Sequence, residues 1–129
     1  MARYLLDTDV LIDHLKGRAP SVALIRSLQR DGHKLGVCCV NIAELYSGVA
    51  ERDQYGAAEL VDALDYFEVS RDAAQMAGEY RHRFARKGIQ LSATDAITAA
   101  TAVEYAATLV TGNIAHYPMQ ELLILKLPR

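Results

Sequence analysis

The sequence predicts an α/β fold, a three-layer α/β/α sandwich in which helices cover both faces of a central, mostly parallel sheet. Short apolar runs alternate along the chain with segments that repeat apolar residues at helical spacing, the order typical of parallel sheets. The run LGVCCV at 35–40 is apolar throughout, as in a strand buried on both faces. The 129 residues contain no internal repeat or linker, so we expect one domain over 1–129.

The first quarter of the chain predicts a strand and two helices. The apolar run at 4–6 predicts a short strand that leads into an acidic segment. A helix is expected over 8–15, because Gly17 then interrupts the pattern. The segment 20–30 repeats apolar residues every three positions and predicts a second helix, which precedes the apolar strand described above.

The middle of the chain predicts two more helices and a short strand. Asn41 is a suitable N-cap, and the apolar residues after it follow the i, i+3, i+4, i+7 pattern of a helix. The same pattern returns over 57–64. The run YFEV at 66–69 predicts the next strand.

The last part of the chain predicts two longer helices and two strands. The helix over 71–87 is expected to end at Gly88, with basic residues in its last turn as the helix dipole prefers. Ser92 is expected to cap an alanine-rich helix over 93–106. TLVT then follows as a strand, and ELLILKL in the tail predicts a final edge strand.

Composition and charge narrow the class of protein. The 14 basic and 16 acidic residues give a net charge of −2, which argues against binding nucleic acid by bulk charge alone. Cys38 and Cys39 are adjacent, a poor geometry for a disulfide, so we expect two buried thiols in a reducing compartment. The most apolar late stretch, AITAATAVEYAATLV, is too polar to span a bilayer, and a soluble cytoplasmic protein without a signal peptide is expected.

Polar side chains recur where the predicted strands end and the next helices begin: Asp7, Glu44, Asp95 and Asn113. The carboxyl ends of parallel strands meet at one edge of a sheet, so we expect these side chains to share a cleft. Clustered carboxylates repel one another unless a cation lies among them, and an oxygen-only set favours Mg²⁺ or Mn²⁺. Such ions activate water and neutralise charge on a phosphate, which is the chemistry of phosphoryl transfer.

Helix capping is the alternative role for two of these acids. Asn41-x-x-Glu44 resembles a capping box and Ser92-x-x-Asp95 is one, and acids in a first turn also complement the helix dipole. On a helical wheel, however, Glu44 lies opposite the apolar stripe of its helix, and Asp95 lies at the edge of its own. Both can therefore face a cleft, while Asp7 ends a strand where no periodicity requires an acid.

Four segments, in order, resemble the PIN-domain ribonucleases, in particular the VapC-type toxins of bacterial toxin–antitoxin pairs. They are YLLDTDVLID, NIAELYSG, SATDAITAATA and LVTGNIAHYP, the last with the ending T-x-N-x-x-H-[FY]. The resemblance implies that Asp7, Glu44 and Asp95 are the invariant acids of that family. Asn113 falls where many members carry a fourth acid, and Thr111 matches the small hydroxyl residue just before it. One tightly bound ion is therefore expected, with a second ion site weakened by the amide.

The resemblance also implies an activity and its partners. Asp7 and Asp95 would bind a Mg²⁺ or Mn²⁺ ion, and Glu44 would complete the cluster as a ligand or as the general base for water. That water would attack an RNA phosphodiester in line and leave a 5′-phosphate, so the chain would be an endoribonuclease toxin. A small VapB-like antitoxin would occlude the acidic cleft, and members of the family usually form homodimers through helices.

Three further charged features allow more than one interpretation. Asp9 either caps the first helix or restores the charge that Asn113 lacks, whereas Asp13, one turn on, is expected at the surface. The densest basic cluster lies late in the 71–87 helix. It is expected to be a solvated helix face, with the binding of RNA phosphates as the alternative. Its members are Arg81, His82, Arg83, Arg86 and Lys87.

Two other functions stay open from the sequence. LLDTDVLID nearly matches the D-x-D-x-[TV] opening of haloacid-dehalogenase-type phosphatases, in which the first Asp is a nucleophile. Leu11 occupies the [TV] position, however, and the late loop TGNIAHYP contains no acid to hold magnesium. The other alternative is a degenerate PIN fold that binds a partner without catalysis, and the neutral Asn113 is the feature that favours it.

Overall fold

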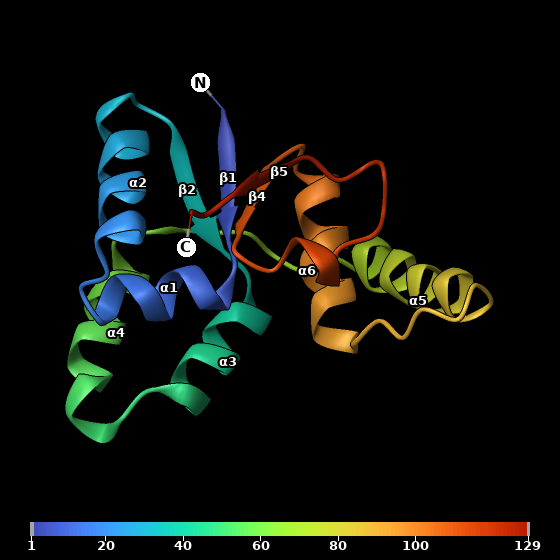
Figure 1. Cartoon of the computed structure of the whole chain (residues 1–129), viewed down its shortest axis with the longest axis horizontal. Coiled ribbons are helices and arrows are strands. Elements are labelled where there is room, and N and C mark those ends of the chain that lie inside the picture. The colour runs from blue at the N-terminus through green and yellow to red at the C-terminus, as the bar shows by residue number, and fades with distance from the viewer. Residues whose placement is uncertain (1, 129) are drawn as a thin grey trace.

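The computed structural model describes residues 2–128, which form a parallel sheet flanked by helices (Figure 1). The strands are β1 (Arg3–Leu6), β2 (Lys34–Val37), β3 (Asp65–Tyr66), β4 (Thr108–Thr111) and β5 (Ile124–Lys126). The α-helices are α1 (Thr8–Leu15), α2 (Ala19–Arg30), α3 (Cys39–Gly48), α4 (Gln54–Asp62), α5 (Arg71–Ala85) and α6 (Ala93–Glu104), with 3₁₀ turns η1 (Glu51–Asp53) and η2 (Ile114–His116). The predicted α/β class is confirmed.

The sheet has the strand order β3-β2-β1-β4-β5, and its four pairings are all parallel. The chain starts at the central strand β1, moves outward through β2 and β3, and then crosses back to β4 and β5. The direction of winding therefore changes between β1 and β4. In open parallel sheets this switch point leaves a crevice beyond the carboxyl ends of the two strands, where ligands bind.

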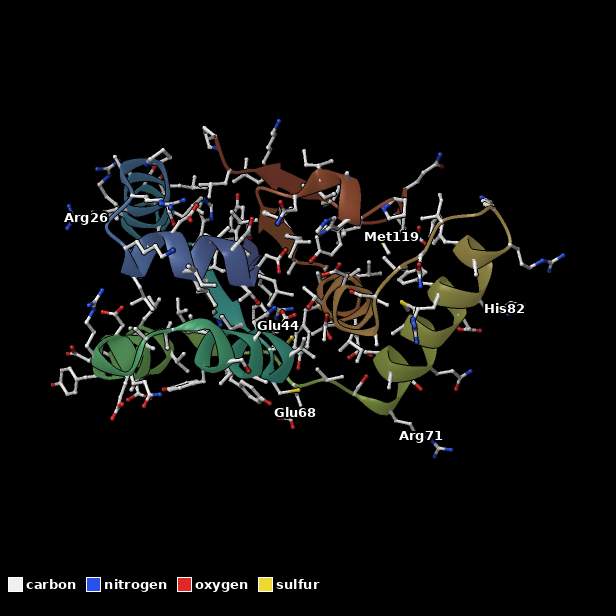
Figure 2. The ribbon with its side chains drawn as sticks, turned by 60° about the horizontal axis from the view of Figure 1, so that its bottom comes forward. Arg26, Glu44, Glu68, Arg71, His82 and Met119 are labelled. Atoms are coloured by element: carbon white, nitrogen blue, oxygen red, sulfur yellow. The ribbon has the colours of Figure 1, made fainter. Side chains whose placement is uncertain are left out.

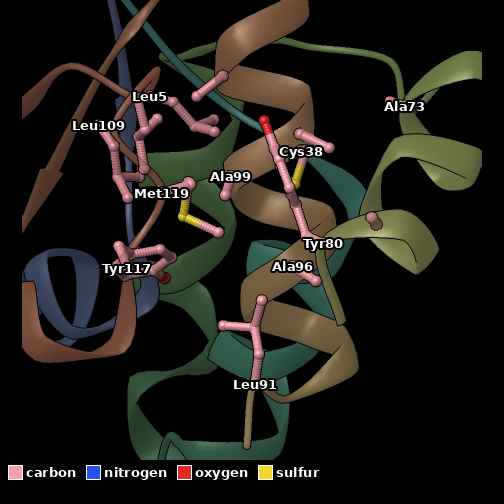
Figure 3. Packing of buried hydrophobic residues seen from close by; sticks show 14 of the residues in the cluster. Leu5, Cys38, Ala73, Tyr80, Leu91, Ala96, Ala99, Leu109, Tyr117 and Met119 are labelled. Carbon is pink, nitrogen blue, oxygen red and sulfur yellow. The ribbon is translucent and has the colours of Figure 1, made fainter. Parts of the chain in front are cut away.

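Helices cover both faces of the sheet, which confirms the predicted three layers. Successive residues of a strand point to opposite faces, so Leu5 and Leu109 lie in one apolar cluster and Leu6 and Val110 lie in the other. The first cluster packs under α5 and α6, and the second packs under α1 to α4 (Figure 1). Figure 3 shows the first cluster, in which the small Ala99 of α6 faces the strand leucines. Within residues 2–128, no helix is long and apolar enough to cross a membrane.

The junction between β2 and α3 corrects the sequence-based prediction. The apolar run at 35–40 was expected to be one strand, but β2 ends at Val37 and Cys38 is the N-cap of α3. Asn41 is therefore inside the first turn and is not itself the cap. Its Oδ1 accepts a hydrogen bond from the backbone N–H of Cys38 at 3.0 Å, and this bond stabilises the earlier helix start. A short apolar run cannot distinguish a strand from the buried start of a helix.

Two other details around β2 follow from packing. Gly36 of β2 leaves room for Phe67, because a Cβ at Gly36 would lie 2.9 Å from the aromatic ring and 2.9 Å from the carbonyl oxygen of Asp65. The expectation of two buried thiols is right for Cys38 and wrong for Cys39, which is exposed. Since Cys39 begins a helix instead of ending a strand, its side chain points outward from the first turn.

Candidate active site

Asp7 lies at the carboxyl end of β1, at the switch point of the sheet, and is the N-cap of α1. Its backbone N–H continues the ladder to β4 by donating to the carbonyl of Val110 at 3.0 Å. Its side chain is only 7% exposed. Oδ1 accepts from the backbone N–H of Thr8 at 2.8 Å, and Oδ2 accepts from the hydroxyls of Thr111 at 2.9 Å and Tyr117 at 2.7 Å. Three donors from three parts of the chain therefore fix this carboxylate.

Burial makes the negative charge of Asp7 costly. The pKa of Asp7 is raised from 3.8 to about 6, mainly by desolvation and also by the nearby charge of Asp9. The hydrogen bonds from Tyr117, Thr8 and Thr111 lower the pKa, but they do not offset the loss of water. Near neutral pH, an ionised Asp7 is thus a buried anion without a positive neighbour among its hydrogen-bond donors, the setting in which a cation is most stabilising.

Asp95 lies in the first turn of α6 and meets Asp7 through one hydroxyl. The backbone N–H of Asp95 donates to the hydroxyl of Ser92 at 3.1 Å, which confirms that Ser92 caps the helix. The Tyr117 hydroxyl oxygen, 2.7 Å from Asp7 Oδ2, lies 3.2 Å from Asp95 Oδ1. A phenol carries one proton, so it can donate to only one of the two carboxylates at a time. Asp95 Oδ2 also lies 3.6 Å from His116 Nδ1.

Glu44 lies on α3, which packs against α1. The helix starts at Cys39, so Glu44 lies in its second turn, and the expectation of a first-turn acid is wrong. Its Oε1 accepts from the hydroxyl of Thr8 at 2.7 Å, and its side chain is half-buried. Figure 2 shows Glu44 on the side of α3 that faces α1 and α6. Glu44 is thus linked to Asp7 through the adjacent residue Thr8, and it is not held by a capping interaction.

Asn113 and Asp9 form a pair at the start of the loop after β4. Asp9 Oδ2 accepts from the backbone N–H of Gly112 at 2.8 Å and from Asn113 Nδ2 at 3.3 Å. The backbone N–H of Asn113 donates to the Thr111 hydroxyl at 3.0 Å, and that hydroxyl donates to Asp7. The N-cap of α1 is Asp7, so the expected capping role of Asp9 is wrong. Asp9 instead holds the β4 loop and brings a carboxylate beside the amide of Asn113.

In the part of the chain that the structure describes, the side-chain oxygens of the site are of the kind that binds Mg²⁺ or Mn²⁺, but they are not yet gathered around one point. Within residues 2–128, no three His, Cys, Asp or Glu side chains already converge closely enough to form a metal site. Asp7 and Asp95 do share a hydroxyl and so lie within two hydrogen-bond lengths of each other. Glu44 and Asn113 are each one hydrogen-bonded residue away from Asp7. All of these groups are carboxylate, amide or hydroxyl oxygens, the set that suits Mg²⁺ or Mn²⁺.

Of the expectations about charged residues outside the site, the one for Asp13 needs correction. Asp13 was expected at the surface, yet it is 7% exposed and lies 3.3 Å from Arg18 Nη1, because α2 packs against this side of α1. The basic cluster late in α5 is exposed, as expected for a solvated helix face. Within it, Arg81 Nε donates to the carbonyl of Leu91 at 3.0 Å, so its guanidinium also helps to hold the α5–α6 loop. Arg83 Nη2 lies 3.5 Å from Glu121 Oε1, so Arg83 forms an ion pair at the surface.

Sequence reasoning did not assign roles to Tyr117 and Thr8. Tyr117 is the last residue of the T-x-N-x-x-H-[FY] ending, so its position was noted, but no periodicity or charge pattern indicates where its hydroxyl points. Thr8 was hidden among the three acids of LLDTDVLID. In the structure these two hydroxyls connect Asp7 to Asp95 and place Glu44 beside it.

The family model named PIN domain matches residues 4–119. The chain belongs to the PIN-domain family. The curated relative Ribonuclease VapC10 of Mycobacterium tuberculosis is 31% identical over 117 residues, which cover 91% of this chain and 87% of the relative. Ribonuclease VapC19 of the same organism is 29% identical over 115 residues, 89% of this chain and 92% of the relative. This PIN domain is therefore of the VapC type.

Solved structures agree with the fold of this PIN domain. VapBC2 from Rickettsia felis, bound to a DNA fragment from its promoter, contains a chain that superposes with a TM-score of 0.86 over 96% of this chain and 98% of that one, at 22% identity. At such low identity the likeness concerns the fold alone. The family membership favours the nuclease over the phosphatase interpretation of LLDTDVLID.

Proposed function

We propose that this PIN domain is a metal-dependent endoribonuclease that acts as the toxin of a toxin–antitoxin pair. The observation that carries the proposal is the meeting of Asp7 and Asp95 at one Tyr117 hydroxyl, at the switch point of a parallel sheet. These carboxylates come from distant parts of the chain and repel each other, an arrangement that a divalent cation stabilises. The two relatives named ribonucleases support the same activity.

The residues of the site would have different roles in phosphodiester hydrolysis. Asp7 and Asp95 would hold the Mg²⁺ or Mn²⁺ ion, with Glu44 completing the set. When bound, the ion supplies an activated water and neutralises charge on the scissile phosphate. Glu44 Oε1 is held by Thr8, which leaves Oε2 to accept a proton from the attacking water. The proposed products are a 5′-phosphate and a 3′-hydroxyl.

The basic end of α5 is part of the proposal as the surface that holds RNA. A surface groove of about 770 Å³ is lined by four basic side chains together with Gly78 and the acid Glu79; the basic residues are His82, Arg83, Arg86 and Lys87. Figure 2 shows His82 at the outer side of α5. The loop 86–92 connects this end of α5 directly to α6, whose first turn carries Asp95. Phosphates bound at Arg86 and Lys87 would therefore lie along a path that leads to the carboxylates.

A small protein antitoxin completes the proposed system. The similar structure from Rickettsia felis is a VapBC complex, and another from Klebsiella pneumoniae is a toxin–antitoxin complex. A cleft lined by Asp7, Asp95 and Glu44 is a suitable site for an arginine of such a partner. We include a cytoplasmic location in the proposal, since the substrate is RNA, and a homodimer, since members of the family usually form one. Expression of this chain alone should slow bacterial growth, the Asp7→Asn variant should not, and sedimentation should give twice the mass of the chain.

Cleavage of a defined RNA by the purified protein tests the activity. We expect cleavage with Mg²⁺ or Mn²⁺, none with a chelator, and a loss of several orders of magnitude for Asp95→Asn. Asp62→Asn, an exposed acid at the end of α4, is the matched control and should cleave normally. Cleavage by Asp95→Asn at the wild-type rate would contradict the assignment. Binding of RNA without cleavage by the wild type would favour the non-catalytic binding module instead.

A further inference from the structure

Tyr117 combines a buried ring with a hydroxyl that reaches the site. Its ring is 3% exposed and belongs to the cluster between the sheet and α5 and α6. Figure 3 shows it at the edge of that cluster, beside Met119. The packing therefore fixes the position of the ring, and with it the position of the hydroxyl oxygen. This rigidity matters because the hydroxyl lies within hydrogen-bond distance of both Asp7 and Asp95.

The hydroxyl of Tyr117 takes up one of the hydrogen-bond acceptor positions of the Asp7 carboxylate. A carboxylate offers about four lone-pair positions, two on each oxygen. Oδ2 already accepts from Tyr117 and Thr111, so both of its positions are used. Among residues 2–128, Oδ1 accepts only from the backbone N–H of Thr8. The one open position on Asp7 is thus on Oδ1.

We propose that Tyr117 is a positioning residue for the metal site, whose hydroxyl occupies Asp7 Oδ2 and so presents Oδ1 to the ion while fixing the separation between Asp7 and Asp95. The inference rests on the proposed function and deepens it. Without the hydroxyl, Asp7 has a second open position and can rotate about its last torsion, so the arrangement of the two carboxylates is less well defined. Groups that orient metal ligands in this way typically contribute a factor of about 10 to 100 in affinity.

The variant Tyr117→Phe isolates the hydroxyl, because phenylalanine keeps the buried ring. Tyr80→Phe is the matched control. Tyr80 is 4% exposed and belongs to the same apolar cluster, but its hydroxyl faces Glu121 outside the site. Both variants lose one tyrosine hydroxyl near a carboxylate, so a general effect of the substitution on packing would appear in both.

Calorimetric titration of the metal-free proteins with Mn²⁺ tests the inference. We expect Tyr117→Phe to bind Mn²⁺ at least about tenfold more weakly than the wild type, and Tyr80→Phe to bind it as the wild type does. The melting temperatures of the two metal-free variants, measured in parallel, should lie close together. RNA cleavage as a function of Mn²⁺ concentration should shift to higher metal for Tyr117→Phe alone.

Each other outcome has a distinct meaning. Equal Mn²⁺ affinity of Tyr117→Phe and the wild type, in proteins that cleave RNA, overturns the positioning role and leaves the proposed function intact. Equal weakening by Tyr80→Phe shows a packing effect and also overturns it. A wild type that neither binds Mn²⁺ nor cleaves RNA overturns the proposed function, and the inference with it.

Discussion

The side chain of Asp7 is hydrogen-bonded to three separate parts of the chain, and its burial should make the free energy of unfolding depend on pH. Hydrogen bonds to its side chain come from α1, from the end of β4 and from the segment after η2. These donors hold the carboxylate in place, while desolvation opposes its ionisation. At the scale of residues, the position of the Asp7 carboxylate is thus well defined, but its negative charge is costly in this buried place. A bound cation would offset that cost.

The pH dependence of stability follows from Asp7. In the folded, metal-free protein its pKa is about 6, against an ordinary value of 3.8. A raised carboxyl pKa adds stability that is fully present below the ordinary value and is lost as pH rises through the folded value, here between about pH 4 and 6. The loss from this group is on the order of 3 kcal/mol at most. Asp7→Asn should lack this loss.

Urea unfolding in the presence of a chelator measures this difference. At pH 7.5 we expect Asp7→Asn to be at least as stable as the wild type, because the amide removes a buried charge and the hydroxyls of Thr111 and Tyr117 can reorient toward it. At pH 5 the advantage should be smaller. The same pH dependence in both proteins would mean that Asp7 is not the buried anion described above.

Asn113 and Asp9 allow a second test at the residue scale. Asn113→Asp places a carboxylate beside Asp9 Oδ2, so the two charges repel each other unless a cation lies between them. We expect tighter Mn²⁺ binding and cleavage at lower metal concentration. The exchange variant Asp9→Asn/Asn113→Asp restores one charge and one amide, and should bind metal much as the wild type does. Two strong sites in the unmodified protein would show that Asp9 already acts as the additional acid.

The residues of the site differ in how far sequence predicts them. Asp7 and Asp95 were predicted to meet, and the structure joins them through one hydroxyl. The ligand set itself stays a prediction. The bridging role of Tyr117 could not be predicted, because a tyrosine in a loop gives no periodic signal and its direction depends on the packing of its ring. The burial of Asp13 depends likewise on tertiary contact with α2.

At the scale of elements, a buried polar contact aligns the two helices that carry Glu44 and Asp95. Asn41 is fully buried in the first turn of α3. Its Oδ1 accepts from the N–H of Cys38, and its Nδ2 donates to the hydroxyl of Thr98 on α6 at 3.3 Å. One amide therefore accepts the backbone N–H of the N-cap residue of α3 and connects this helix to α6.

Asn41→Ala should lower the stability of the fold and also disturb the site. The substitution leaves the N–H of Cys38 without its acceptor in a buried place, which costs about 1–3 kcal/mol. Ser47→Ala on the same helix is the control, since Ser47 is exposed and its hydroxyl bonds only within α3. Urea unfolding should show a clear loss for Asn41→Ala and little change for Ser47→Ala. Equal stability of the two variants would contradict the structural role.

Elements were predicted well where periodicity was long and poorly where it was short. The helix over 8–15 has the predicted bounds, and those over 20–30, 71–87 and 93–106 lie within two residues of α2, α5 and α6 at each end. The strand predicted at 66–69 is only Asp65–Tyr66. The boundary between β2 and α3 was missed, because it is set by the side chain of Asn41 and by burial, which a run of apolar letters does not reveal.

At the scale of the whole molecule, the fold class, the three layers and the parallel sheet were predicted because strands and helices alternate along the chain. The strand order β3-β2-β1-β4-β5 was not predicted, since alternation leaves open where the chain turns back. That order places the end of β1 beside the end of β4, and hence Asp7 beside Thr111.

Metal binding should stabilise the whole domain. A ligand that binds only the folded state, at a free concentration 100 times its dissociation constant, adds about 2.7 kcal/mol. We therefore expect Mn²⁺ to raise the melting temperature by several degrees, and a chelator to reverse the rise. Asp95→Asn should show a much smaller rise, whereas Asp62→Asn should behave as the wild type. An equal rise in Asp95→Asn would place the ion elsewhere on the molecule.

The residues of the site are far apart along the chain, and this affects when the site can form during synthesis on the ribosome. Asp7 and Tyr117, which share a hydrogen bond, are 110 residues apart in sequence. Every parallel pairing also needs a long crossover before it forms. A nascent chain therefore contains its first carboxylate from the outset but cannot assemble the centre until its last segments have emerged from the exit tunnel. We expect the nuclease to be harmless to the ribosome and the messenger that are still producing it.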